Sequence, residues 1–481
     1  MMRLRILSLA LGAGLASGCA TLAPEHERPA PPVPEAFPQA SALPEGQLAE
    51  TIPWRDYFTD PRLREVIAQA LENNRDLRVA ALNIEKARAQ YRIQRADLFP
   101  AVGADGSQTV QRLPGDLTTT GEPMTQRQYS ATLGFAAWEL DFFGRIRSLN
   151  AQAMEQYLAT EQARRSVQIS LIAEVAQVWM TLAADRERLA LAQRTYETRA
   201  QSHELTRRSF ELGAVSALDL RQSETLLEGA RADRARFQAV VNQDENALAL
   251  LVGAPLRAEW LPESLGESAA AVAGLKAGVP SEVLVRRPDV LQAEHELRAA
   301  NASIGAARAA FFPSIALTAA GGTASSSLDG LFASGSGTWT FMPQVRLPIF
   351  EAGRLRASLD VAELQRDIGI ARYEKAIQTA FREVADALAE RATLGEQLDA
   401  RRRLVEASRD SFRLSEARYT AGVDSYLGLL DAQRSLYAAE SLLIDARLSV
   451  AVNRVVLYKV LGGGSTLTAL PVPFPGRPGQ S

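Results

Sequence analysis

Two long stretches of this chain lack the residues that interrupt helices. Residues 145–212 and residues 354–421 each span 68 positions without proline, and only the second contains glycine, at Gly369 and Gly395. Apolar side chains recur every seven residues inside them, as at Leu182, Leu189, Tyr196, His203 and Phe210, or at Leu398, Val405, Phe412 and Tyr419. This heptad pattern predicts helices packed as coiled coils. At 1.5 Å per residue, each helix would be roughly 100 Å long.

Each long stretch is followed by a glycine and a second helical pattern. Gly213 and Gly422 stand where glycine commonly ends a helix, and they predict the turns at the tips of two helical hairpins. Ser216 and Ser425 follow three residues later and can cap the returning helices. The heptads of the second returning helix are the clearest, at Leu429, Leu436, Leu443, Val450 and Leu457.

Four shorter segments alternate between apolar and polar positions. They are residues 101–112, 129–140, 314–323 and 338–348. Period-two patterning over about ten residues is typical of transmembrane barrel strands, although a half-buried sandwich strand gives the same pattern. Pro343 removes a backbone donor from the last segment and predicts a bulge or edge irregularity there. Four strands cannot close a barrel, and open edges are not viable in lipid, so several copies would have to share one barrel.

The chain is a tandem duplication. The Gly-Arg pair at residues 144–145 recurs at 353–354, and Gly213 recurs as Gly422, both 209 residues later. The Phe-Pro pair at 99–100 recurs at 312–313, at an offset of 213. The predicted segments are a first repeat at 54–253, a linker at 254–280, a second repeat at 281–462 and a flexible tail at 463–481.

The N-terminus has the pattern of an export signal. Two arginines precede a short apolar run, which ends in small residues and Cys19. This resembles a bacterial lipoprotein signal and predicts a signal peptide at 1–18 and covalent lipid on Cys19. An ordinary secretory leader with an incidental cysteine is the alternative. Residues 19–53 are rich in proline and predict an extended, lipidated N-terminal segment.

Composition and charge exclude several classes of function. The chain is 47% hydrophobic and 23% charged, which indicates a folded protein, and its net charge of −3 offers no footprint for nucleic acid. One cysteine and three scattered histidines predict no disulfide framework, metal site or histidine-based active site. The chain has no Walker A sequence for a nucleotide. We therefore expect no enzymatic activity and no cofactor other than the lipid on Cys19.

Several motifs, in order along both repeats, carry a family resemblance. They are WRDYFTDPRL at 54–63, ALENNRDL at 70–77, SALDLRQ at 216–222 and YTAGVDSYLGLLDAQR at 419–434. On these motifs the mature chain resembles the TolC-type outer-membrane efflux proteins, in particular their OprM/NodT lipoprotein branch.

The resemblance implies a mainly α-helical fold with a transmembrane β-barrel part. In that fold a homotrimer shares a twelve-stranded barrel in the outer membrane and extends a long helical barrel into the periplasm, with the linker at 254–280 in a girdle around it. It also implies the exit duct of a tripartite pump, which passes drugs or other small toxic compounds. The implied partners are a periplasmic adaptor and an inner-membrane transporter of the RND type.

The resemblance also implies a gate at the periplasmic tip. Leu427 and Asp431 fall where this branch places an apolar and an acidic constriction ring, which would resist wetting and disfavour anions. Arg418 and Tyr419 match residues that hold the gate shut. Arg418 with Asp431, and Tyr419 with Asp185, are the implied latches. The alternative is that these are ordinary polar groups on helix surfaces.

Two other functions remain open from the sequence. The same fold serves as the exit channel of metal-efflux or type I protein-secretion systems, whose cargo is chosen largely upstream. A structural periplasmic coiled-coil lipoprotein without a pore would share the helices but would not need the four barrel-like segments.

Overall fold

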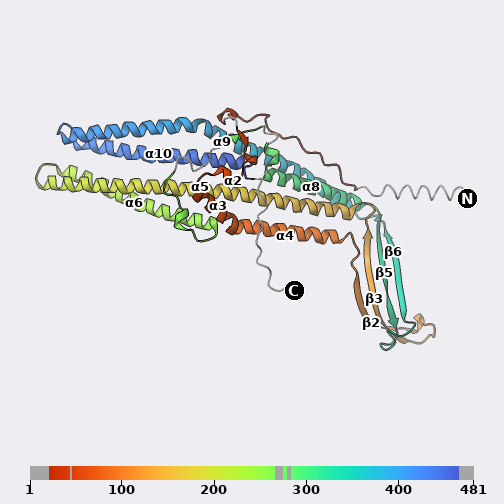
Figure 1. Cartoon of the computed structure of the whole chain (residues 1–481). Helices are drawn as coiled ribbons and strands as arrows, with labels where there is room; N and C mark the ends of the chain where they lie inside the picture. The colour runs from red at the N-terminus through yellow and green to blue at the C-terminus, as the bar shows by residue number, and fades with distance from the viewer. Residues whose placement is uncertain (1–20, 44–45, 266–274, 279–282, 465–481) are drawn as a thin grey trace. The chain divides into compact units, whose positions relative to one another are not determined.

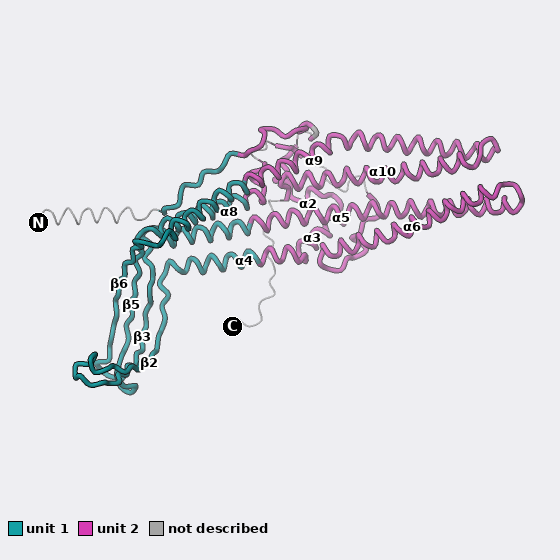
Figure 2. The backbone as a smooth tube through the Cα atoms, turned by 180° about the vertical axis from the view of Figure 1, so that it is seen from behind, with its two compact units in different colours: residues 1–30, 83–161, 292–373 teal, residues 31–82, 162–291, 374–481 magenta. Residues whose placement is uncertain are grey.

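The computed structural model describes residues 21–43, 46–265, 275–278 and 283–464. Cys19, the predicted signal peptide at 1–18 and most of the predicted tail lie outside these residues. The chain forms two compact units (Figure 2). The first comprises residues 1–30, 83–161 and 292–373, and the second residues 31–82, 162–291 and 374–481. Each unit takes residues from both sequence repeats, so the compact units cut across the duplication.

The first unit contains a four-stranded antiparallel sheet (Figure 1). Its strands, in the order in which they pair, are β2 (Gly103–Leu113), β3 (Met124–Leu140), β5 (Ser314–Ser325) and β6 (Gly337–Arg346). All four predicted segments are therefore strands. Strand β3 begins five residues earlier than its alternating pattern, because the mostly polar residues 124–128 pair with residues 109–113 of β2.

The sequence predicts an irregularity at Pro343, but the structure shows none there. Pro343 pairs in continuous register with Leu317, and β6 is an edge strand of the sheet within the chain, where a missing backbone donor is tolerated. The register instead shifts in β3 between Phe135 and Trp138. Ala137, inside this shift, has a φ of 52° and donates its N–H to Thr318 Oγ1 at 3.0 Å. The bulge is thus centred on an alanine, and no proline or glycine at that position indicates it in the sequence.

Two helices of 67 residues confirm the long stretches without helix breakers. They are α5 (Arg145–Glu211) and α9 (Arg354–Thr420). Each starts directly after a glycine of positive φ, Gly144 or Gly353. The other helices are α2 (Trp54–Tyr57), α3 (Pro61–Asn73), α4 (Arg75–Ala96), α6 (Ala217–Val252), α8 (Pro288–Ala309) and α10 (Tyr426–Val460).

The caps of the two returning helices differ. Ser216 and Asp219 form a reciprocal capping box at the start of α6, as the sequence predicts for Ser216. Ser425 occupies the same position before α10, but its side chain makes no capping hydrogen bond. The residue three positions after it is Gly428, which has no carboxylate to complete a box.

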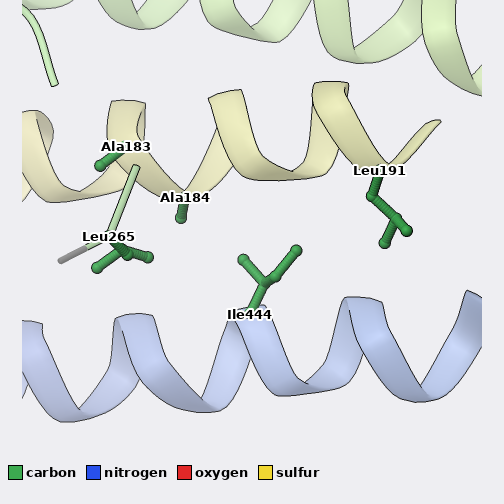
Figure 3. Close-up of a cluster of buried hydrophobic side chains, with 5 residues drawn as sticks. All are labelled: Ala183, Ala184, Leu191, Leu265 and Ile444. Atoms are coloured by element: carbon green, nitrogen blue, oxygen red, sulfur yellow. The ribbon is translucent and has the colours of Figure 1, made fainter. Parts of the chain in front are cut away.

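The core of the second unit holds its helices together through buried apolar and aromatic contacts. Figure 3 shows Ala183, Ala184 and Leu191 of α5 facing Ile444 of α10, with Leu265 beside them. Tyr57 and Tyr458 stack at 3.9 Å between ring centroids. A two-residue parallel pairing of β1 (Gln47–Leu48) with β4 (Leu275–Lys276) also lies in this unit.

Helix α5 contains the one stretch, among the described residues, that is long and apolar enough to cross a membrane as a helix. Two thirds of that stretch, 67%, is buried inside the chain itself. Trp179 illustrates this burial: it is 1% exposed and donates its ring N–H to the carbonyl of Trp260 at 3.0 Å. The stretch therefore serves as a core helix.

Candidate gate at the hairpin ends

Both hairpins end in the same backbone turn. Gly422 has a φ of 71° and donates its N–H to the carbonyl of Tyr419, while Val423 donates to the carbonyl of Arg418, both at 2.9 Å. Gly213 has a φ of 74° and donates in the same way to Phe210. A left-handed conformation of this kind strains any residue with a Cβ atom, so the two predicted tip glycines are needed here.

An ion pair closes the α9–α10 turn. The Arg418 guanidinium donates to both carboxylate oxygens of Asp424, at 2.5 and 2.9 Å. This bond raises the pKa of Arg418 and lowers the pKa of Asp424. The expected partner of Arg418 was Asp431, and the structure corrects that pairing within the chain. Asp424 precedes α10 and lies across the turn from Arg418, whereas Asp431 lies more than one helical turn further along.

Leu427 and Asp431 lie four residues apart on α10, so they share one face of the helix. Leu427 is 61% exposed and the Asp431 side chain is 70% exposed. Within the described residues, Asp431 forms an ion pair with Arg434 of the same helix at 3.4 Å. This face is therefore available to meet other copies of the chain, as the two constriction rings require.

Other residues of the first turns of α10 fasten the tip to the rest of the unit. Tyr426, Leu429 and Leu430 are buried there and pack against Leu226 of α6 and Phe412 of α9. Tyr419 belongs to the same cluster, with its ring 5.3 Å from that of Tyr426. Burial raises the pKa of Tyr426. Tyr419 thus acts inside the chain as a packing residue.

The structure does not bring Tyr419 to Asp185. Asp185 is buried and accepts a hydrogen bond from Arg188 at 2.5 Å, and Arg188 also binds Asp445 of α10. Asp445 lies 19 residues after Tyr426, which corresponds to about 28 Å along the helix. The implied Tyr419–Asp185 latch is therefore corrected: a spacing of 28 residues before a turn places Asp185 far from the hairpin tip.

Asp185 instead belongs to a cluster of charged residues at mid-hairpin, which sequence reasoning missed. Asp244 of α6 lies beside Asp185, and burial followed by that neighbouring carboxylate raises the pKa of Asp244 to about 7. Arg188 partly offsets this effect. Asp244 therefore holds a proton more readily than an ordinary aspartate does where α5 packs on α6.

We expect Asp244→Asn to raise stability at neutral pH and to flatten its dependence on pH. The folded Asp244 keeps a proton that the unfolded residue, with a pKa of 3.8, has lost, so the wild-type protein loses stability as the pH rises from about 4 to about 7 and no further above it. Thermal unfolding at several pH values measures this slope. Asp399→Asn, at an exposed carboxylate of α9, is the control, and equal slopes in wild type and Asp244→Asn would contradict the assignment.

No group of three or more His, Cys, Asp or Glu residues suited to a metal ion occurs in the described ranges. Of the residues at the candidate gate, Asp424 could have been predicted, because it follows Arg418 by six positions across a glycine turn. Asp244 could not, since only the packing of α6 on α5 brings it to Asp185.

A family model describes most of this chain. The model for outer membrane efflux protein matches residues 66–254 and 279–463, which correspond to the two repeats. The toluene efflux pump outer membrane protein TtgC of Pseudomonas putida is 52% identical over 463 residues, covering 95% of each chain. The outer membrane protein OprJ of Pseudomonas aeruginosa is 44% identical over 455 residues, again covering 95% of each.

Solved structures agree with this match. A crystal structure of a membrane protein from Pseudomonas aeruginosa has a TM-score of 0.87 at 43% identity and covers 92% of this chain and 100% of that one. The open state of the Neisseria gonorrhoeae MtrE outer membrane channel has a TM-score of 0.83 at 41% identity and covers 92% and 98%. The chain therefore belongs to the outer membrane efflux protein family and is an outer-membrane exit channel of the tripartite efflux-pump type.

Proposed function

We propose that three copies of this chain close one duct through the outer membrane. The observation that carries the proposal is the four-stranded sheet, whose outer strands β2 and β6 each pair on one side only within the described chain. Unpaired edges cost too much free energy to persist in lipid, and three such sheets supply the twelve strands of a closed barrel. The exposed face of Leu427 and Asp431 then recurs three times around one axis.

The energy and the selection of cargo come from partners. We propose that the periplasmic hairpin ends receive an adaptor protein, which links the duct to an inner-membrane transporter of the RND type. The cargo we propose is small apolar or aromatic compounds and antibiotics. Relatives named for toluene efflux and antibiotic efflux, each 52% identical to this chain, support that class. We propose that lipid on Cys19 adds a second attachment to the membrane.

Planar-bilayer conductance of the purified protein, with its oligomeric mass measured in parallel, tests this function. We expect a trimer that conducts small, cation-preferring currents, because the acidic face of Asp431 would line the narrowest part of the duct. Heat-dissociated protein is the control for contaminating porins. A monomer that does not conduct would overturn the proposal and favour a structural coiled-coil lipoprotein.

A further inference from the structure

Helix α8 carries a stripe of unusual side chains on one face. Glu294, Arg298, Asn301, Gly305 and Arg308 follow one another at spacings of four, three, four and three residues. This spacing keeps all five on one side of a helix, where a coiled coil would seat another helix. Here the stripe is occupied by an extended segment, residues 22–28 of the same unit.

The contacts proceed in order along both segments. Arg28 binds Glu294, the carbonyl of Pro24 accepts from Asn301 at 2.8 Å, and the carbonyl of Leu22 accepts from Arg308 at 3.4 Å. From Glu294 to Arg308 the helix rises about 21 Å, and the six residues from Arg28 back to Leu22 span about 21 Å when fully extended. The two lengths match, so the segment lies antiparallel to α8 without slack.

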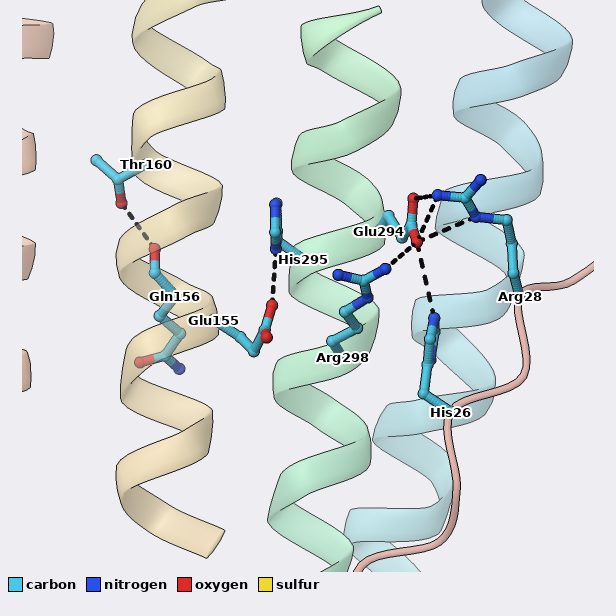
Figure 4. A network of polar contacts seen from close by, with 8 residues as sticks. All are labelled: His26, Arg28, Glu155, Gln156, Thr160, Glu294, His295 and Arg298. Atoms are coloured by element: carbon cyan, nitrogen blue, oxygen red, sulfur yellow. Dashed lines mark hydrogen bonds and ion pairs between the residues drawn. The ribbon is translucent and has the colours of Figure 1, made fainter. Parts of the chain in front are cut away.

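Glu294 is the most specific of these contacts (Figure 4). Its side chain is 2% exposed and receives three hydrogen bonds from Arg28, at 2.7, 2.9 and 3.1 Å, and one from Arg298 at 2.6 Å. His26 lies 3.9 Å away, and burial followed by Arg298 lowers its pKa, so it adds no charge at neutral pH. A buried carboxylate is stable only with such partners, and Arg28 supplies the bidentate one.

Gly305 gives the segment room to approach the helix backbone. A Cβ atom at this position would lie 2.7 Å from the backbone nitrogen of Ala23 and 2.6 Å from the hydroxyl of the buried Ser148. The Ala23 nitrogen belongs to the backbone, so it could yield only if the segment itself moved. Any side chain at residue 305 would therefore displace Ala23 from this face of α8.

The first repeat can be compared with α8 position by position. At the offset of 213 residues, the first repeat has Ala81, Glu85, Arg88, Arg92 and Arg95 where α8 has Glu294, Arg298, Asn301, Gly305 and Arg308. That copy has its carboxylate one turn later, at Glu85, and lacks the amide and the glycine, so its sequence cannot make the same contacts in the same order. The stripe is thus a feature of the second repeat alone, as expected if it evolved to receive one segment.

We propose that this face of α8 is a binding site for the N-terminal segment of the mature chain, and that Glu294 is its specificity-determining residue. The docked segment acts as a strap of fixed length that ends beside the last turn of α8, six residues before strand β5 begins. Three residues span at most about 11 Å. If Cys19 is lipidated, as the proposed function holds, the strap fixes the lipid within that distance of Leu22 and so near the sheet.

A nitroxide spin label at Thr21→Cys tests the strap in the full chain. Arg28→Ala removes the strap's arginine but leaves Glu294 paired with Arg298, so α8 should fold normally. We expect an immobilised label in the parent protein. We expect Arg28→Ala to raise the ratio of mobile to immobile label by about tenfold or more, because a charge-assisted bidentate contact is lost. Gly305→Leu should have the same effect, and Glu27→Gln, at an exposed neighbour on the strap, should have none.

The same measurement in a Cys19→Ser chain exported by an ordinary secretory leader separates the strap from the lipid. Continued immobilisation there supports docking on α8 independently of lipid or conductance. A label that is already mobile in the parent protein, or that responds equally to Arg28→Ala and Glu27→Gln, would overturn the proposal. Failure of the channel to conduct would leave this result unchanged, so the two hypotheses are tested separately.

Discussion

Gly322→Val should nearly abolish the assembled oligomer in the outer membrane, whereas Gly321→Val should leave it close to the wild-type level. A Cβ atom at residue 322 would lie 2.1 Å from the carbonyl oxygen of Ala131 and 2.7 Å from the Cα atom of Thr132. Both atoms belong to the backbone of β3, which pairs with β5 at the centre of the sheet. The strands would have to separate to accommodate the side chain.

Separating β3 from β5 costs much free energy, because the barrel strands lie in the membrane and not in water. Backbone groups that lose their partners inside a membrane find no water, and each unsatisfied group costs several kcal/mol. At Gly321 an added Cβ atom meets nothing within 4 Å, although the residue is adjacent and in the same strand. Outer-membrane fractions run on gels with and without heating would measure the oligomer. Equal oligomer levels in the two variants would show that β3 and β5 do not pair as described.

The helical part of the fold could be predicted because its signals are local. Two stretches without breakers, each ended by a glycine, gave α5 and α9 to within one residue of their observed C-terminal ends, at Glu211 and Thr420. The strands were harder to predict at their polar ends. Residues 124–128 form part of β3 through pairing with β2, and no alternation in their own sequence indicates it.

At the candidate site, too, the features set by local sequence were predictable and the contacts between distant residues were not. The turn glycines Gly213 and Gly422 were predictable, because a left-handed turn demands that residue type whatever surrounds it. The approach of Asp244 to Asp185 was not predictable, because pairing between helices depends on how far each has risen along its axis. A count of residues from a turn does not give that register unless both helices are placed.

The strap on α8 lies beyond what the sequence alone could show. Arg28 and Glu294 are 266 residues apart, and neither belongs to a recognisable motif. The heptad spacing of the stripe would predict another helix as its partner. Its actual partner is an extended proline-containing segment, and a glycine on the stripe makes that close approach possible. The comparison with the first repeat becomes informative only once those contacts are known.

Asp431→Asn should remove the cation preference of the channel, and Leu427→Ala should raise its conductance several-fold. In a trimer, three copies of each exposed side chain would face one another near the hairpin tips, where an acidic ring attracts cations and an apolar ring resists wetting. Single-channel recordings with a salt gradient measure both quantities. Because ion selectivity and conductance are measured separately, the double variant should show the loss of selectivity together with the raised conductance.

Asp410→Asn is a closely matched control for the acidic ring. Asp410 has a side chain 72% exposed and a neighbouring Arg413 at 3.5 Å, against 70% and Arg434 at 3.4 Å for Asp431. The two carboxylates thus share a local environment and differ in their place on the hairpin. If Asp410→Asn changed ion selectivity as much as Asp431→Asn, the effect would come from overall surface charge and the assigned constriction would be rejected.

Arg418→Ala adds a test of the corrected ion pair. Since Arg418 binds Asp424 across the turn, its removal should loosen the tip by a route separate from the charge of Asp431. Changes in the logarithm of conductance from Arg418→Ala and Asp431→Ala should therefore add in the double variant, as they do for independent sites. A double variant no different from either single one would instead indicate that Arg418 meets Asp431 of a neighbouring copy and that the gate is held between chains.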